Sequence, residues 1–370
     1  MSAPAPRPAV IIGAGPAGLA TSYELGRRGI DHLVLERDQV AASWSRVYDS
    51  LTLHTGKHMS SLPGLPFPKA TPLFIGRESF RQYLVDYRAR FDLPVREGTP
   101  VTAVHRDGEA WRVATSGGEI ETRAVVVATG IMATPRTPGI KGSERFGGRI
   151  RHSVTYRSPE ECRGKRVLVV GAGNSAGEIA SELGRAGVDT TIAVRSGANV
   201  VPLQILGVPI QYLSIGMRKL PRTAQNLIVA AMRRFVDLIK GPPPIARPDY
   251  GPLDSIPMIG FKLVDAIRDG RVKLRGGIDE LTGDGARFTG GVEEPFDEII
   301  LATGFRATVD LFGSLIRVDR RGFAVRKDRV ASADHPSLFF VGHNYDSTGA
   351  LFNIRRDAGL VAEAIRSGQS

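Results

Sequence analysis

The sequence predicts an α/β fold of two nested Rossmann-like dinucleotide-binding domains, and two duplicated patterns support this prediction. Residues 10–18 and residues 167–176 each join a short apolar run to G-x-G-x-x-G or G-x-G-x-x-A and then to a helix rich in Ala, Leu and Glu. Residues 125–130 and residues 299–304 are each an apolar strand that ends in Ala-Thr-Gly. Both halves therefore share one plan, and two nucleotide-binding turns imply two bound nucleotides.

Each of the two glycine-rich turns uses its small residues for separate purposes. The first glycine allows a tight turn, the second lets a pyrophosphate approach the backbone, and the third small residue lets the helix pack closely on the strand. The N-terminus of the helix then meets the phosphates. The residues concerned are Gly13, Gly15, Pro16, Ala17 and Gly18 in the first turn, and Gly171, Gly173, Asn174, Ser175 and Ala176 in the second.

The residue after the second strand of each unit distinguishes the two nucleotides. In the first unit, strand 32–35 leads to Glu36, about 20 residues after the turn, where an acid can hydrogen-bond a ribose diol. This favours an adenosine without a 2′-phosphate, such as that of FAD. In the second unit, strand 190–194 leads to Arg195 and Ser196, which favour the 2′-phosphate of NADPH. The alternative is that Arg195 is a solvated surface charge.

The segments between the glycine-rich turns and the Ala-Thr-Gly strands complete the expected order of elements. Short strands near residues 95–104, 111–115 and 120–121 suggest a β-meander before the first Ala-Thr-Gly strand. Residues 131–164 then cross to the second half, with prolines typical of an extended linker.

One of the two expected domains is discontinuous. Residues 1–150 and 305–370 form the FAD-binding domain, and residues 151–304 form the NADPH-binding domain with a helical insertion at about 197–260. The insertion carries Leu, Ile, Met and Tyr at mixed spacing, so it could line a substrate pocket, contact a second subunit or lie against a membrane. A monomer and a homodimer are therefore both open.

Composition is typical of a soluble globular protein that can bury a sizeable core. The 370 residues are 42% hydrophobic and 24% charged. The net charge of +11 could indicate an anionic partner, but the basic residues are scattered and form no block interleaved with aromatic residues. We therefore expect anionic cofactors and substrate, and no nucleic acid.

The sequence lacks the residues that several other kinds of catalysis require. Cys162 is the only cysteine, which argues against a flavoprotein disulfide reductase that needs a paired thiol. No Ser/His/Asp set, carboxylate pair or metal-ligand cluster stands out, so no metal site is predicted. The first residues contain no apolar signal-peptide core, and residues 226–239 are too short and charged to cross a bilayer. A cytoplasmic location without membrane association is expected.

The crossing segment carries a recognisable motif. Residues 146–156 match F-x-G-x-x-x-H-x-x-x-Y, the identifying pattern of flavin-containing monooxygenases, through Phe146, Gly148, His152 and Tyr156. The chain therefore resembles class B flavoprotein monooxygenases over nearly its whole length. The segments that are similar to the plant YUCCA branch are Trp44 and residues 48–54, 62–68 and 247–252, and residues 301–305 are similar to the family's FATGY-type element.

The resemblance implies a reaction and two cofactors, FAD and NADPH. NADPH reduces FAD, O₂ adds at flavin C4a, and the resulting (hydro)peroxyflavin inserts one oxygen atom into a small organic substrate. The YUCCA-like segments favour oxidative decarboxylation of a 2-oxo acid, with indole-3-pyruvate the leading candidate. The alternatives are N- or S-oxygenation of a soft nucleophile and, in another class, NADPH-dependent flavin reduction or electron transfer without oxygen insertion.

The resemblance also implies cofactor contacts beyond the two turns. For FAD these are Glu36, Arg37, Trp44, Thr129, Gly130, Gly342, Gly349, Ala350 and Leu351. For NADPH they are Arg195, Ser196, Thr303 and Gly304. The backbone N–H groups at the start of the last helix, near residues 349–351, would face the flavin edge where negative charge develops on reduction.

His54 is the candidate catalytic residue. It falls where animal flavin-containing monooxygenases carry an asparagine that interacts with the flavin and the retained NADP⁺, and YUCCA-like members have histidine there. The alternative is a histidine that is hydrogen-bonded locally and has no catalytic role.

Overall fold

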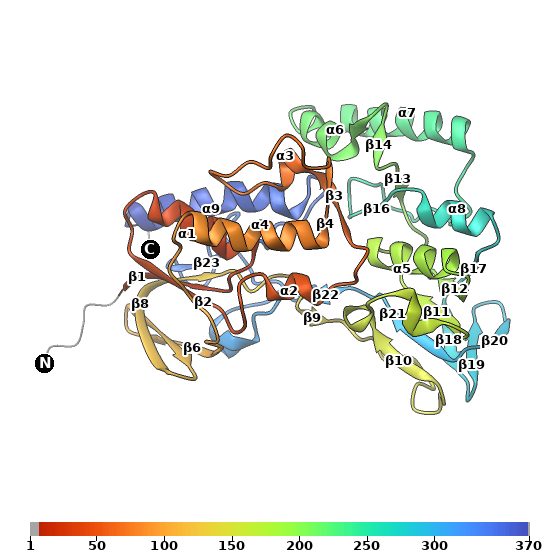
Figure 1. Ribbon diagram of the computed structural model, residues 1–370, viewed down its shortest axis with the longest axis horizontal. Helices are drawn as coiled ribbons and strands as arrows, with labels where there is room; N and C mark the ends of the chain where they lie inside the picture. The colour runs from red at the N-terminus through yellow and green to blue at the C-terminus, as the bar shows by residue number, and fades with distance from the viewer. Residues whose placement is uncertain (1–6, 369–370) are drawn as a thin grey trace, which may run out of the picture.

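A computed structural model describes residues 7–368, in which two large sheets are joined by two chain crossings (Figure 1). The first sheet has seven strands in the order β5-β2-β1-β8-β7-β6, with β23 paired to β8. Its strands are β1 (Arg7–Ile12), β2 (His32–Leu35), β5 (Val95–Arg96), β6 (Val101–Asp107), β7 (Ala110–Thr115), β8 (Gly118–Val127) and β23 (Leu338–Phe340).

The predicted β-meander is present as β6, β7 and β8, which pair antiparallel. Two of its predicted boundaries are wrong. Residues 95–104 form two strands, because Gly98 turns the chain with φ +62° and Pro100 has no N–H to donate to a ladder. The strand predicted at 120–121 is part of β8, which runs without a break to Val127.

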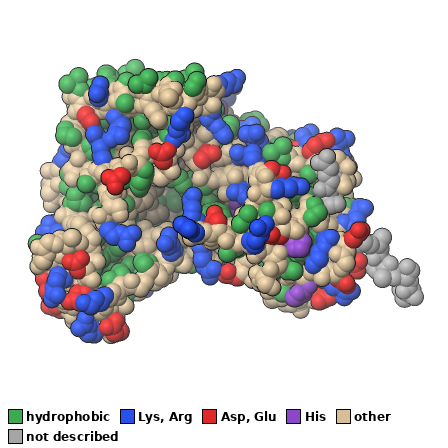
Figure 2. Space-filling model, turned by 180° about the vertical axis from the view of Figure 1, so that it is seen from behind, with side chains coloured by type: hydrophobic (Ala, Val, Ile, Leu, Met, Phe, Trp, Pro, Cys, Tyr) green, Lys and Arg blue, Asp and Glu red, His purple; other side chains and the backbone are tan. Residues whose placement is uncertain are grey.

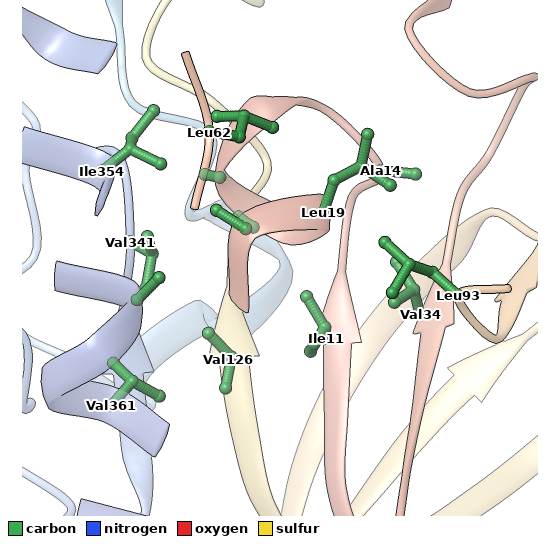
Figure 3. Packing of buried hydrophobic residues seen from close by; sticks show 14 of the residues in the cluster. Ile11, Ala14, Leu19, Val34, Leu62, Leu93, Val126, Val341, Ile354 and Val361 are labelled. Atoms are coloured by element: carbon green, nitrogen blue, oxygen red, sulfur yellow. The ribbon is translucent and has the colours of Figure 1, made fainter. Parts of the chain in front are cut away.

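The core of the first sheet explains the apolar runs in its central strands, residues 9–12 of β1 and 124–127 of β8. Ile11 of β1 and Val126 of β8 face a cluster that includes Leu19 of helix α1 (Pro16–Gly26) and Val361 of helix α9 (Ala350–Arg366) (Figure 3). The alternate residues of these strands, such as Val10 of β1 and Val125 of β8, face a second cluster on the opposite side of the sheet. Helix α4 (Arg77–Arg90) packs into the first cluster, and Val309, Phe312 and Ile316 pack into the second, so both faces of the sheet are buried.

The second sheet has five parallel strands in the order β10-β21-β11-β12-β17. They are β10 (Arg149–His152), β11 (Arg166–Val170), β12 (Asp189–Ala193), β17 (Val272–Arg275) and β21 (Glu298–Leu301). Helices α5 (Asn174–Arg185) and α8 (Lys262–Arg268) supply buried residues to the cluster on one face. A small antiparallel sheet follows, made of β18 (Ile278–Leu281), β19 (Gly285–Phe288) and β20 (Glu293–Pro295).

The chain crosses between the sheets twice, and the two crossings pair with each other. Strand β9 (Thr134–Pro135) on the outward crossing pairs antiparallel with β22 (Phe305–Arg306) on the return. The remaining short elements are α2 (Ala42–Ser45), β3 (Thr52–Gly56), α3 (Lys57–Ser60), β4 (Phe74–Gly76), η1 (Ser153–Thr155), η2 (Pro159–Cys162) and η3 (Asp310–Leu315).

The insertion between β12 and α8 contains two helices and four short strands. These are β13 (Val200–Val201), β14 (Gln204–Ile205), β15 (Val208–Pro209), α6 (Ile210–Met217), α7 (Arg222–Lys240) and β16 (Met258–Ile259). The helices lie along one edge of the molecule, where apolar side chains are exposed (Figures 1 and 2). Within residues 7–368, no helix is long and apolar enough to span a bilayer.

Candidate functional site

One cavity of ≈ 550 Å³ is lined by residues from both sheets and from the insertion. A hollow is visible in the middle of the face in Figure 2, between the two halves of the molecule. The carboxyl ends of parallel strands are the usual ligand-binding edge of open α/β sheets. The expected FAD residues that line the cavity are Gly13, Gly15, Pro16, Ala17, Glu36, Arg37, Trp44, Thr129, Gly130, Gly342, Gly349, Ala350 and Leu351.

The first glycine-rich turn borders a space that no protein atom occupies. Gly15 has φ −80° and ψ −171°, a conformation open to any residue, and a Cβ built there would meet no atom within 4 Å. Neither the backbone nor the packing requires glycine at this position. The open space in front of helix α1 is the space that a pyrophosphate would occupy, so the turn fits a dinucleotide.

The glycines on either side of Gly15 are required by the fold itself. A Cβ on Gly13 would lie 2.6 Å from the carbonyl oxygen of Ala128, and one on Gly18 would lie 1.8 Å from the carbonyl oxygen of Gly13. Gly18 therefore packs helix against turn and does not line the cavity. The predicted division of tasks among the three glycines agrees with these contacts.

Glu36 is held at the end of β2 with its carboxylate beside the turn. Its Oε2 accepts a hydrogen bond from the Ala14 N–H at 2.7 Å, and its Oε1 accepts one from the Asp38 N–H at 3.0 Å. Glu36 also lines the cavity. A ribose bound beside helix α1 would meet this carboxylate.

The second glycine-rich turn repeats the geometry of the first. Gly173 has φ −93° and ψ 179°, and a Cβ there would again meet no atom within 4 Å. A Cβ on Gly171 would lie 2.3 Å from the carbonyl oxygen of Ala302 and 3.3 Å from the Cβ of Ala176, which is buried. Asn174 and Ser175, at the start of helix α5, line the cavity.

The other expected NADPH residues lie around this turn, outside the lining of the cavity. Arg195 and Ser196 are exposed beyond the end of β12, and Arg195 has no ion-pair partner among residues 7–368. The Thr303 hydroxyl donates to the Arg136 carbonyl at 2.6 Å, and the Gly304 carbonyl accepts from the Arg136 N–H at 2.9 Å. Thr303 and Gly304 thus hold the two crossings together.

The monooxygenase motif makes structural contacts and does not line the cavity. Burial lowers the pKa of His152, and its Nε2 lies 3.0 Å from the Gly304 carbonyl. The Tyr156 hydroxyl donates to Glu182 of helix α5 at 2.9 Å. A Cβ on Gly148 would lie 2.6 Å from both the Asp297 carbonyl and the ring of Phe146. The motif therefore fixes the outward crossing against the second sheet.

His54 bridges the two halves of the molecule inside the cavity. Its Nε2 lies 2.7 Å from Oε1 of Glu178 on helix α5, and the Tyr48 hydroxyl donates to the other oxygen of the same carboxylate. Burial raises the pKa of Glu178, but the bonds from His54 and Tyr48 outweigh it, so the pKa is lowered. Because an ionised carboxylate only accepts, His54 carries a proton on Nε2.

Sequence reasoning missed Glu178. It lies 124 positions from His54, and no local pattern connects the two. The available signal was its place near the start of helix α5, five residues after Gly173 of the second glycine-rich turn.

The chain is similar to several known proteins. Residues 10–201 match the family model described as pyridine nucleotide-disulphide oxidoreductase. The chain is 38% identical over 321 residues to indole-3-pyruvate monooxygenase YUCCA1 of Oryza sativa, covering 81% of this chain and 77% of the relative. It is 36% identical over 381 residues to the probable indole-3-pyruvate monooxygenase YUCCA10 of Arabidopsis thaliana, covering 97% of each.

Among solved structures, a flavin-containing monooxygenase from Stenotrophomonas maltophilia shares the fold. The TM-score is 0.79 at 24% identity, and the match covers 98% of each chain. The shared fold agrees with the predicted α/β class.

The fold and the two turns define a pyridine-nucleotide-linked oxidoreductase. More narrowly, the chain belongs to the flavin monooxygenase family that includes the YUCCA enzymes, and it is a flavin-dependent monooxygenase. The predicted family and enzyme class are confirmed. The lone Cys162 is buried outside the cavity, so the dithiol chemistry in the family model's description is not available to this chain.

Gly15→Val is expected to leave the fold intact and to remove the flavin, because the new side chain would occupy the open space before helix α1. Flavin absorbance per chain and thermal unfolding measure the two effects. Gly76→Val is the matched control. Gly76 also precedes a helix in extended backbone with no atom within 4 Å of a Cβ, but it does not line the cavity. Full flavin content in Gly15→Val would contradict this assignment.

Proposed function

We propose that this chain is an FAD- and NADPH-dependent monooxygenase that converts an apolar 2-oxo acid, such as indole-3-pyruvate, to the acid one carbon shorter. The balanced reaction is R–CH₂–CO–COOH + O₂ + NADPH + H⁺ → R–CH₂–COOH + CO₂ + NADP⁺ + H₂O. The supporting observation is that one cavity reaches both glycine-rich turns under an apolar roof from the insertion. The similarity to YUCCA enzymes, whose names state indole-3-pyruvate, supports the substrate class.

In this proposal the domain that contains the first sheet, made of residues 1–150 and 305–370, binds FAD. Gly15, Glu36 and the start of helix α9 would hold it, with the α9 N–H groups at its electron-accepting edge. Residues 151–304 bind NADPH, through Gly173 and Ser175 at helix α5. FAD reduced by NADPH supplies the activation of O₂ and the transfer of one oxygen atom.

The protein's own part in the reaction is to orient the reactants and to exclude water. The roof of the cavity contributes apolar side chains, among them Ile210 of α6 and Val229, Met232 and Val236 of α7. Below it, the His54–Glu178 hydrogen bond ties the first half of the chain to the second at the cavity wall. A fixed and dry site favours oxygen transfer over loss of peroxide.

The reaction is tested by turnover of indole-3-pyruvate with NADPH under ¹⁸O₂. Catalase is added because free H₂O₂ decarboxylates 2-oxo acids without an enzyme. We expect one ¹⁸O atom in the new carboxyl group and one CO₂ per NADPH consumed. NADPH consumption without labelled product would indicate a flavin reductase, and label in an amine or sulfide substrate alone would indicate N- or S-oxygenation. Either result contradicts the proposal.

Arg195→Ala is expected to remove most of the preference for NADPH over NADH. A charge-assisted hydrogen bond to the 2′-phosphate is worth roughly 1.5–3 kcal/mol, or about 10- to 100-fold in affinity. The ratio of kcat/KM values for the two nucleotides measures the effect. Arg271→Ala is the control, because Arg271 is also exposed and precedes the neighbouring strand β17. An unchanged ratio would show that Arg195 is only a surface charge.

His54→Ala is expected to leave flavin reduction by NADPH nearly normal, while H₂O₂ release rises and product per NADPH falls. Glu178→Gln should shift the same coupling ratio in the same direction, since an amide is a weaker acceptor for Nε2–H than a carboxylate. His58→Ala is the control, because His58 bonds Tyr212 and does not line the cavity. Unchanged coupling in His54→Ala would leave His54 as a packing residue, and loss of flavin would make it structural.

A further inference from the structure

The roof of the cavity contains charged groups that the proposed reaction has not used. Helix α7 turns one side toward the cavity, and that side carries Arg233 and Asp237 beside the apolar Met232. Arg247, on the segment after α7, reaches the same part of the lining. Two guanidinium groups and one carboxylate therefore lie together in a roof that is otherwise largely apolar.

The charges in this group do not balance. Asp237 pairs with Arg247. Arg233 is partly buried and has no hydrogen-bond or ion-pair acceptor among residues 7–368. Burial first, and then the neighbouring Arg247, lower the pKa of Arg233 against the opposing effect of Asp237, yet Arg233 remains a cation because a guanidinium is not deprotonated in proteins. An unpaired, partly desolvated cation is costly unless an anion joins it.

We propose that Arg233 binds the carboxylate of the substrate, with Arg247 held by Asp237 as a second donor beside it. A guanidinium fork matches a carboxylate with two parallel N–H···O bonds, and the apolar side chains around it would receive the body of the acid. The substrate class is then an apolar or aromatic acid with a free carboxylate. This assignment rests on the proposed function, because it names the substrate class of the same cavity.

A phosphate of NADPH is the other anion that could meet Arg233. The expected phosphate sites lie elsewhere in the second half, at the start of helix α5 and at Arg195. Arg233 comes from the insertion, on the side of α7 that carries the apolar roof. This placement favours the substrate, and the experiment below separates the two sources.

The test compares an acid with its neutral amide on the FAD-loaded enzyme. Indole-3-propionate and indole-3-propionamide share one skeleton and lack the 2-oxo group, so binding can be measured by equilibrium dialysis without turnover. In Arg233→Met, which keeps length and apolar packing, the Kd of the acid is expected to rise about 10- to 100-fold. The Kd of the amide and that of NADPH should stay nearly unchanged.

Arg234→Met is the matched control, because Arg234 is the next residue, is exposed and does not line the cavity. It should bind the acid like the parent. Arg233→Lys, which keeps the charge without the fork, should lie between the parent and Arg233→Met. Acid and amide weakened equally would mean that Arg233 only packs the roof. Weaker NADPH binding with unchanged acid binding would assign Arg233 to a phosphate. Either outcome overturns the proposal.

The outcome is distinguishable from failure of the proposed function. If the acid binds through Arg233 but ¹⁸O₂ turnover gives no labelled product, the carboxylate site stands and the reaction is wrong. If labelled product forms but the Kd of the acid does not change in Arg233→Met, the reaction stands and the carboxylate site is refuted.

Discussion

The relative placement of the two nucleotide-binding halves depends on a small set of hydrogen bonds where the chain crosses between them. Strands β9 and β22 pair, Thr303 bonds Arg136 across them, and His152 bonds the Gly304 carbonyl. The two sheets have separate buried clusters, although Tyr48 of the first half packs into the cluster of the second. The crossings fix the angle between the sheets together with the bonds from His54 and Tyr48 to Glu178, and the carboxyl ends of both sheets border one cavity.

In this arrangement the monooxygenase motif has a structural role, although a motif that identifies an enzyme class suggests a catalytic one. Residues 146–156 contain a histidine and a tyrosine, side chains that commonly carry out proton transfer. Here both are buried and turned toward the backbone or toward helix α5, and the cavity is lined by others. A sequence pattern can mark an enzyme class because it fixes geometry, while the reacting groups belong to the cofactors and to segments with weaker patterns.

Local patterns predicted the parts of the structure that depend on local physics. The two turns, Glu36 at the end of β2 and the antiparallel meander all follow from spacing within short windows. The bond between His54 and Glu178 could not be predicted, because it joins residues 124 positions apart. The side of α7 that faces the cavity could not be predicted from the sequence either. The helix is strongly amphipathic, but much of its apolar face, including Leu227, Leu238 and Ile239, is exposed, so the apolar pattern does not mark the side that lines the cavity.

Helix α7 contributes to the cavity wall without belonging to either core. None of its side chains is fully buried, and Leu238 is 86% exposed although Val236, two residues earlier, lines the cavity. Substitutions on this helix therefore remove few core contacts, and their cost to folding should be small compared with substitutions in β1 or β11. The preference for one substrate over another can consequently diverge among related chains, or be altered by an engineer, while the cofactor-binding framework and its stability remain as they are.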